Sequence, residues 1–292
     1  MTTRRTLLVA ALALSLGAAA QAQTMRLLVG YTAGGPVDAA ARQFAPALAK
    51  ELGMPVVVEN KPGANATLAG DLVAKAAPDG QTIWFAASPP LTIGPHIMKK
   101  MAFDPVKDIA AIAPVVAYYN VLVINKDAPF KTLPELVAHA KANPGKLAYG
   151  SAGLATASQL RLEMLKYRTQ TDILHVPYRG SADALNDLLP NNVQMMNEIN
   201  VLPHVKSGKL RVFATTAPTR LSLMPEVPTF AELGFKELTE VVWVGLWTTP
   251  DMPAAMPCLP SRICLAPVKP SFARKAAVSP SAAASKAPSR LR

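Results

Sequence analysis

Short apolar runs alternate with stretches of helical period between residues 25 and 250. Turns such as Pro78-Asp-Gly80 and Asn143-Pro-Gly145 separate them. The expected strands are Met25–Gly30, Val56–Glu59, Thr82–Ala87, Val115–Asn125, Leu147–Gly150, Lys209–Thr216 and Val241–Trp247. The expected helices are Ala39–Gly53, Thr67–Ala76, Thr132–Lys141, Ala155–Tyr167 and Pro228–Gly234. This alternation predicts an α/β fold in which parallel or mixed sheets are covered by helices.

The stretch Tyr31-Thr-Ala-Gly-Gly-Pro-Val-Asp38 joins the first expected strand to the first expected helix. A strand that ends at paired glycines and enters a helix leaves backbone N–H groups free at the helix start, where the helix dipole is positive. Such a site favours an anion. Gly150-Ser-Ala-Gly153 and Arg179-Gly-Ser181 repeat the pattern. Loops of this kind facing one another predict a pocket for a small carboxylate.

The candidate ligand-binding residues lie in these loops and at neighbouring strand ends. They are Tyr31, Thr32, Ala33, Gly34, Gly35, Asp38, Ser88, Ser151, Gly153, Thr156, Gly180, Ser181, Ala182 and Glu198. We expect N–H groups of Thr32–Gly35 and Ser151–Gly153 to bind carboxylate oxygens. We expect Gly180–Ala182 to hold the other end of the ligand.

Several of these residues also have a purely structural interpretation. Asp38 can stabilise the dipole of the first helix, and the paired glycines can simply make a tight turn. Ser151 and Thr156 can cap the helix that begins near Ala155. Glu198 can receive a ligand ammonium group or point into water. The sequence leaves these alternatives open.

Metal and enzyme chemistry have little support in the sequence. The four histidines are scattered and form no ligand pair at helical spacing. The chain contains no G-x-S-x-G, G-x-G-x-x-G, P-loop or H-E-x-x-H motif. We therefore expect no metal, no cofactor and no catalysis. A hydrolase-like enzyme that uses Ser151 is the less favoured alternative.

The formal net charge of +11 does not indicate a nucleic-acid partner. Two charges come from Arg4 and Arg5 and seven from basic residues after Asp251, which leaves +2 for residues 23–251. That nearly balanced segment has no basic stripe interleaved with aromatic residues. Cys258 and Cys264, the two cysteines, both lie after Asp251, and their spacing supports neither a metal site nor a reactive thiol.

The two ends of the chain differ from the segment between them. Arg4, Arg5, the apolar run Leu7–Leu16 and Ala20-Gln-Ala22 predict a signal peptide over residues 1–22 and a periplasmic location. General secretion is favoured over a twin-arginine route. Residues 251–292 are rich in Pro, Ala, Ser and basic residues without amphipathic period, a composition typical of disorder.

A series of short motifs resembles the solute receptors of tripartite tricarboxylate transporters, the Bug-type periplasmic binding proteins. The resemblance covers roughly residues 25–250 and rests on the order of the motifs. They are Tyr31–Asp38 with Ala41-Arg42, Val58–Ala64, Pro78–Thr82, Asn143–Lys146, Gly150–Gly153, His175–Gly180, Ser207–Arg211, Pro225–Thr229 and Glu232-Leu-Gly234.

The resemblance implies a two-lobed Venus-flytrap fold of the type II class. Lobe one is expected to comprise residues 23–124 and 225–250, and lobe two residues 125–224, with crossing strands near Val121–Asn125 and Arg211–Thr216. The implied function is capture of a tricarboxylate, dicarboxylate or aromatic acid for the membrane subunits of the transporter. The implied ligand contacts are backbone amides, hydroxyls and waters, and the expected state is a monomer.

The chain departs from the family pattern after Trp247. The family continues there with amphipathic helices that complete lobe one, whereas this chain has the basic Pro/Ala/Ser tail. The abrupt loss of acidic residues and helical period suggests a frameshift near residues 250–257. A non-functional product of a frameshifted receptor gene is therefore a second alternative to a working receptor.

Overall fold

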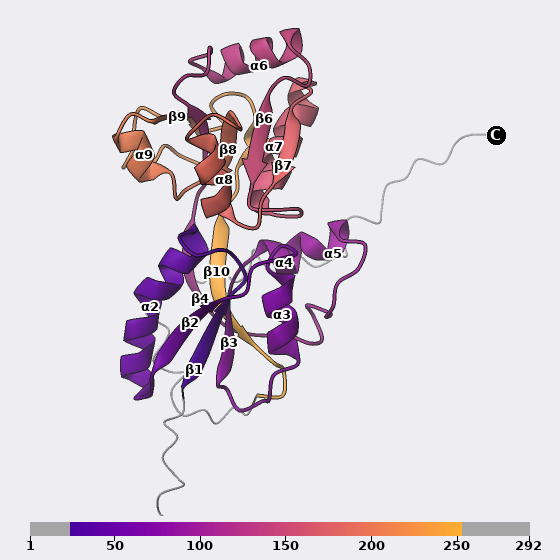
Figure 1. Cartoon of the computed structure of the whole chain (residues 1–292), viewed down its shortest axis with the longest axis vertical. Helices are drawn as coiled ribbons and strands as arrows, with labels where there is room; N and C mark the ends of the chain where they lie inside the picture. The colour runs from indigo at the N-terminus through magenta and orange to yellow at the C-terminus, as the bar shows by residue number, and fades with distance from the viewer. Residues whose placement is uncertain (1–23, 253–292) are drawn as a thin grey trace, which may run out of the picture. The chain divides into compact units, whose positions relative to one another are not determined.

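The computed structural model describes residues 24–252, in which two five-stranded sheets are each flanked by helices (Figure 1). The first sheet has the strand order β2-β1-β3-β10-β4. Its strands are β1 (Met25–Val29), β2 (Val56–Asn60), β3 (Thr82–Ala87), β4 (Ala110–Tyr118) and β10 (Val242–Thr248). Its helices are α2 (Pro36–Leu52), α3 (Thr67–Ala74), α4 (Pro89–Thr92) and α5 (Gly94–Ile97). We call this sheet with its helices lobe one.

The second sheet has the order β7-β6-β8-β5-β9 and, with its helices, forms lobe two. Its strands are β5 (Val121–Asn125), β6 (Ala148–Ser151), β7 (Leu174–Pro177), β8 (Met195–Glu198) and β9 (Leu210–Thr215). Its helices are α6 (Leu133–Ala142), α7 (Ala157–Thr169), α8 (Ser181–Leu188), α9 (Leu202–Lys206) and the 3-10 turn η1 (Lys236–Leu238).

The two sheets follow the same plan. In each sheet three neighbouring strands are parallel, and the fourth strand runs antiparallel to both of its neighbours. That fourth strand, β10 or β5, follows directly on a segment that has come from the other lobe. The chain therefore crosses between the lobes twice, from β4 to β5 and from η1 to β10.

Strand β5 of lobe two is buried on both faces, which explains its continuous apolar sequence. Leu122 and Ile124 of β5 pack on one side with Tyr149 and Phe213. Val121 and Val123, which alternate with them, pack on the other side in a separate cluster. Because successive side chains of a strand point to opposite faces, one short apolar run supplies two cores.

Two expected elements are wrong. Val115–Asn125 forms two strands, β4 and β5, which break at Tyr119 and Asn120 because the chain changes sheets there. Pro228–Gly234 forms turns and not a helix. Thr229 is held in a bridge to Thr215, and Gly234 at φ +88° ends the segment, although Thr229 and Glu232 cap each other as in a helix start.

The sheet boundaries also differ from the lobe boundaries drawn from the sequence. Strand β5 lies wholly in the second sheet. Phe230 and Leu238 pack in the core of lobe two, so this lobe extends to about Glu240. The expected signal peptide and most of the basic tail lie outside the described residues. No helix among residues 24–252 is long and apolar enough to span a membrane.

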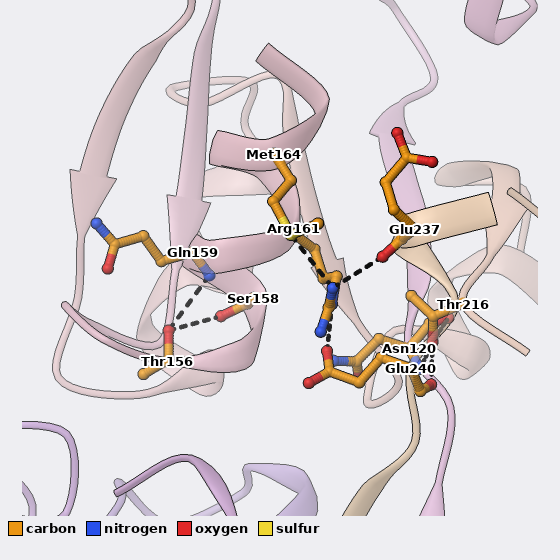
Figure 2. A network of polar contacts seen from close by, with 9 residues as sticks. All are labelled: Asn120, Thr156, Ser158, Gln159, Arg161, Met164, Thr216, Glu237 and Glu240. Atoms are coloured by element: carbon orange, nitrogen blue, oxygen red, sulfur yellow. Dashed lines mark hydrogen bonds and ion pairs between the residues drawn. The ribbon is translucent and has the colours of Figure 1, made fainter. Parts of the chain in front are cut away.

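A polar network ties the two crossover segments together (Figure 2). The N–H of Asn120 donates to Thr216 Oγ1 at 3.0 Å, and the N–H of Thr216 donates to the Asn120 carbonyl at 2.9 Å. Thr216 Oγ1 also donates to the Glu240 carbonyl at 3.0 Å. Arg161 of α7 forms an ion pair with the Glu240 side chain and donates to the Glu237 carbonyl. The hinge is thereby anchored to a helix of lobe two.

Candidate functional site

A cavity lies between the lobes, next to the first crossover. Lobe one contributes Tyr31, Pro36, Val37, Ala87, Pro89, Tyr118 and Val242 to its lining, and the rest of the lining is Asn120, Ala152, Thr156, Ala157, Ser158, Ser181 and Glu198. This lining contains no Lys, Arg or His. The accessible volume is about 30 Å³. A cavity needs roughly 10–15 Å³ of such volume to hold one water, so this closed arrangement has room for only a few atoms.

Four helices begin at this cavity, namely the short helix α4, whose first residue is Pro89, and the three longer helices α2, α7 and α8. Pro36 and Val37 are the first residues of α2, Thr156 to Ser158 surround the start of α7, and Ser181 is the first residue of α8. No side chain caps α2 or α8, so their first-turn N–H groups remain available to another acceptor. The positive ends of helix dipoles from both lobes therefore converge on one small space.

The loop before α2 is held in shape by Asp38. Its carboxylate accepts hydrogen bonds from the N–H of Gly34 at 2.9 Å, from Asn60 Nδ2 at 2.8 Å and from Arg42 Nε at 3.0 Å. Burial alone raises the pKa of Asp38, but these donors outweigh it and hold the pKa below its usual value. Asp38 is 3% exposed and does not line the cavity. It positions the glycine loop from behind.

The side chain of Thr32 lies between this loop and lobe two. Its Oγ1 is buried and has no hydrogen-bond partner among the described residues. A methyl group added to Gly180 would lie 2.2 Å from that oxygen and 3.0 Å from the Thr32 nitrogen. A methyl group on Gly34, which is exposed and has φ +83°, would lie 3.8 Å from Ala182 Cβ. The loops at Thr32–Gly35 and Gly180–Ala182 therefore face each other, as the sequence predicts for loops around one pocket.

The loop after β6 satisfies most of its own polar groups. Ser151 Oγ donates to the Gly153 carbonyl at 3.1 Å and lies 2.7 Å from His175 Nε2. Thr156 Oγ1 donates to the same carbonyl at 2.7 Å and accepts from the N–H of Gln159, which makes Thr156 the cap of α7 (Figure 2). Thr156 lines the cavity, whereas Ser151 and Gly153 lie beside it with Ala152 between them.

Glu198 is the acidic group of the cavity. It ends β8, is 4% exposed and is hydrogen-bonded by the side chains of Ser158 and Ser181. Burial raises the pKa of Glu198 to about 7 in spite of these two hydroxyls, which lower it. Its neighbour Tyr31 is buried and stays neutral, since burial and then the Glu198 charge raise the pKa of the phenol.

The remaining predicted residues fall around the edge of this site. Ser88 is buried between the lining residues Ala87 and Pro89 and does not line the cavity itself. Ala33 is exposed, and Gly35 is the residue before α2.

Among the polar lining residues, sequence reasoning missed Tyr118, Asn120 and Ser158. Asn120 is 3% exposed, and its Oδ1 has no partner among the described residues. The Tyr-Tyr-Asn sequence interrupts an otherwise apolar strand, and that interruption is the signal that could have marked it.

Asn65 was also missed, although it joins the two lobes. Its Nδ2 donates to the Ala155 carbonyl of lobe two at 2.8 Å, while Tyr31 donates from its hydroxyl to Asn65 Oδ1 at 3.1 Å. Asn65 is 5% exposed and has φ +53°. An Asn tolerates that left-handed conformation better than most residues.

Comparison with known proteins agrees with this architecture. The family model described as tripartite tricarboxylate transporter family receptor matches residues 40–277. A protein of Cupriavidus necator, named for the gbd 5' region, is 41% identical over 211 residues, which are 72% of this chain and 64% of the relative. The matched part of the chain thus spans slightly less than two thirds of that relative.

Solved structures give the same result. The periplasmic binding protein BugD is 31% identical, with a TM-score of 0.79 over 86% of this chain and 85% of BugD. MatC of Rhodopseudomonas palustris, solved with bound malate, is 30% identical, with a TM-score of 0.76 over 80% of each chain. The expected two-lobed type II fold is confirmed.

These proteins bind solutes and are not enzymes, so the hydrolase alternative for Ser151 is wrong. The physical reason is visible at the site. Ser151 does contact an imidazole, but its side chain is fully buried and does not reach the cavity. By its sequence motifs, its fold and the match over residues 40–277, the chain belongs to the tripartite tricarboxylate transporter receptor family.

Proposed function

We propose that this chain is a periplasmic receptor that captures a small carboxylate and delivers it to the membrane subunits of a tripartite transporter. One observation carries the proposal. The starts of α2, α7 and α8, which come from both lobes, line a single cavity that contains no basic side chain. Helix starts are the remaining source of positive potential for an anion there.

The ligand contacts proposed here are the free N–H groups of α2 and α8 together with nearby hydroxyls. A hydrogen bond to a charged group contributes about 1.5–3 kcal/mol. Three such bonds reach the range of about 8 kcal/mol that corresponds to micromolar affinity. No arginine clamp is needed. Thr32 Oγ1, which has no partner among the described residues, is a further donor for the ligand or for a bridging water.

The small accessible volume supports a mechanism in which the lobes open and close. A dicarboxylate needs more room than about 30 Å³, so in this proposal the lobes open to admit it and then close on it less far than in the arrangement seen here. A ligand that touches both helix α2 and helix α8 interacts fully only when the lobes are closed. Closure then follows from the difference in affinity between the closed and open forms.

The proposed location and ligand class draw on the relatives as well as on this chain. BugD is described as a periplasmic binding protein, and MatC was solved with malate. The expected signal peptide over residues 1–22 is consistent with the same compartment. The membrane partner follows from the family to which the chain belongs.

The proposal is tested first without choosing a ligand. Native mass spectrometry of freshly purified protein is expected to reveal a co-purifying organic acid. Thermal unfolding is then recorded with malate, citrate, adipate and benzoate, because a ligand that binds only the folded protein raises the midpoint. Ser181→Ala is expected to reduce the shift, and Ser222→Ala, which changes an exposed loop residue, is expected to leave it unchanged.

The same measurements distinguish a working receptor from the non-functional product of a frameshifted gene. A cooperative transition whose midpoint none of these acids moves, with no acid in the mass spectrum, contradicts the receptor proposal. Loss of both the ligand response and the cooperative transition instead supports the product of a frameshifted gene.

A further inference from the structure

We infer that Glu198 binds the ligand as a neutral carboxylic acid and donates a hydrogen bond to a ligand carboxylate, so that capture of the anion takes up one proton. The inference rests on the proposed function, because it concerns the same cavity and assumes an anionic ligand. Glu198 thereby has a specific role in ligand binding, and the binding equilibrium includes a proton.

Glu198 occupies a buried position in the wall of the cavity. It lines the cavity at the end of β8, is 4% exposed, and has the Ser158 and Ser181 hydroxyls as its hydrogen-bond partners. No Lys, Arg or His lines the cavity, and Glu198 takes part in none of the ion pairs found among residues 24–252. A buried charge without a cation is costly, so the neutral form is favoured.

The groups that face Glu198 come from several elements of both lobes. The two titratable ones are the phenols of Tyr31, which follows β1, and Tyr118, which ends β4. Burial, and then the Glu198 charge, raises the pKa of both phenols, so they remain neutral. From α7, α8 and the crossover come Ser158, Ser181 and Asn120, which carry no charge. The described surroundings therefore supply dipoles but no counter-ion.

An anionic ligand further favours the neutral form of Glu198. A carboxylate that enters this cavity brings a second negative charge into a small, enclosed space. Two carboxylates that share a site cannot both stay ionised easily, and one of them takes a proton. Before any ligand enters, burial already raises the pKa of Glu198 to about 7 in spite of the two hydroxyls, well above that of a dicarboxylate in water. Glu198 is therefore the group that takes the proton.

Protonation changes Glu198 from a repelling group into a donor. A neutral carboxyl has one O–H, and an O–H that donates to a carboxylate forms a short, strong hydrogen bond. The proton comes from the solvent and the ligand keeps its charge, so above the pKa of Glu198 each binding event takes up one ligand anion and close to one proton. The opposite arrangement, in which a ligand ammonium group faces ionised Glu198, predicts proton release.

The test is calorimetric titration of the full chain with malate at about pH 6 and about pH 8, in buffers of different ionisation enthalpy. With a pKa of about 7, the neutral fraction of Glu198 falls about tenfold over this interval. The apparent affinity is therefore expected to fall about tenfold. Close to one proton is expected to be taken up per malate bound at about pH 8. Citrate and adipate are measured in the same way if malate does not bind.

Two variants sharpen the measurement. Glu198→Gln keeps a donor that does not titrate, and it is expected to bind with the same affinity at both pH values. Glu226→Gln makes the same change of charge at an exposed position away from the cavity and is expected to retain the tenfold pH dependence. If the Glu198 variant folds poorly, the number of protons that the unaltered chain takes up on binding still tests the inference.

The outcomes are distinguishable. Binding that is independent of pH, without proton uptake, overturns the inference and leaves the receptor proposal standing. Tighter binding at about pH 8 with proton release overturns it in favour of an ammonium-bearing ligand. Absence of binding by every acid at both pH values overturns the inference together with the proposed function.

Discussion

Replacing Asn65 by glycine is expected to weaken closure of the two lobes and, through it, ligand affinity. The Asn65 amide donates to the Ala155 carbonyl at 2.8 Å and so joins lobe one to lobe two. It also accepts from the Tyr31 hydroxyl at 3.1 Å, next to the cavity. Because Asn65 has φ +53°, glycine removes the amide without straining the backbone.

The magnitude follows from the state in which the hydrogen bond is made. In the open form water can reach both partners, so the variant loses the bond only in the closed form. A typical net hydrogen bond contributes about 0.5–1.5 kcal/mol, which corresponds to a factor of about 2 to 13 in the closed-to-open ratio. The apparent affinity falls by the same factor where the closed form is the minor one without ligand.

The assay combines calorimetric titration with small-angle X-ray scattering. Titration measures the loss of affinity, and scattering with saturating and with limiting ligand measures how readily the molecule becomes compact. Asn143→Gly is the matched control, because it removes a 2.9 Å amide-to-carbonyl bond to His139 that lies wholly within lobe two. The reasoning is refuted if Asn65→Gly binds as tightly as the control while both variants are folded.

The other predictions concern the same closing surfaces. Gly180→Ala is expected to reduce ligand affinity about tenfold or more, because the added methyl group would lie 2.2 Å from Thr32 Oγ1 when the lobes are closed. The unfolding midpoint of the ligand-free protein should not fall. Adding Thr32→Ala to the same chain removes that oxygen and should restore part of the affinity. Burial raises the pKa of Glu198 in the folded state from 4.5 to about 7, so the folded form keeps its proton to higher pH than the unfolded form does. The free energy of unfolding is therefore expected to fall by about 3 kcal/mol as pH rises from about 4.5 to about 7. Urea unfolding of Glu198→Gln should lack this loss, and an identical pH profile for the variant and the unaltered chain would contradict the prediction. Asp38→Asn is expected to cost about 1–3 kcal/mol in urea unfolding, because the amide cannot accept from Gly34, Asn60 and Arg42 together. Because the pKa of Asp38 is lowered on folding, its contribution should disappear as pH falls below about 4, and a loss that persists in acid would contradict the assignment.

The sequence was sufficient to predict the fold class because its signals are local and repeated. Apolar runs, glycine turns and capping residues recur in order, and most of them mark a strand or the start or end of a helix. Thr132 and Thr156, for example, cap α6 and α7 through their side chains. The predicted helix at Pro228–Gly234 was wrong although its capping pair is present. The Thr215–Thr229 bridge, a long-range contact, decides that segment, and no local pattern carries it.

The difference between local sequence patterns and long-range contacts also explains which residues of the site could be predicted. Glycine loops before helices mark Tyr31, Thr156 and Ser181, and these residues do line the cavity. Asn65 and Asn120 matter because the other lobe lies opposite them, which depends on how two distant segments meet.

The loops that surround the cavity are held in shape by hydrogen bonds within their own lobes. Asp38 fixes the first loop, and the Gly153 carbonyl is bonded by two hydroxyls in the second. A ligand of the proposed kind therefore does not have to order these loops, so we expect its affinity to depend on its own hydrogen bonds and on the free energy of bringing the lobes together. The Thr216 hydroxyl ties both crossovers at the hinge without lining the cavity. Thr216→Val should therefore change ligand affinity through the closure equilibrium while the ligand contacts stay the same.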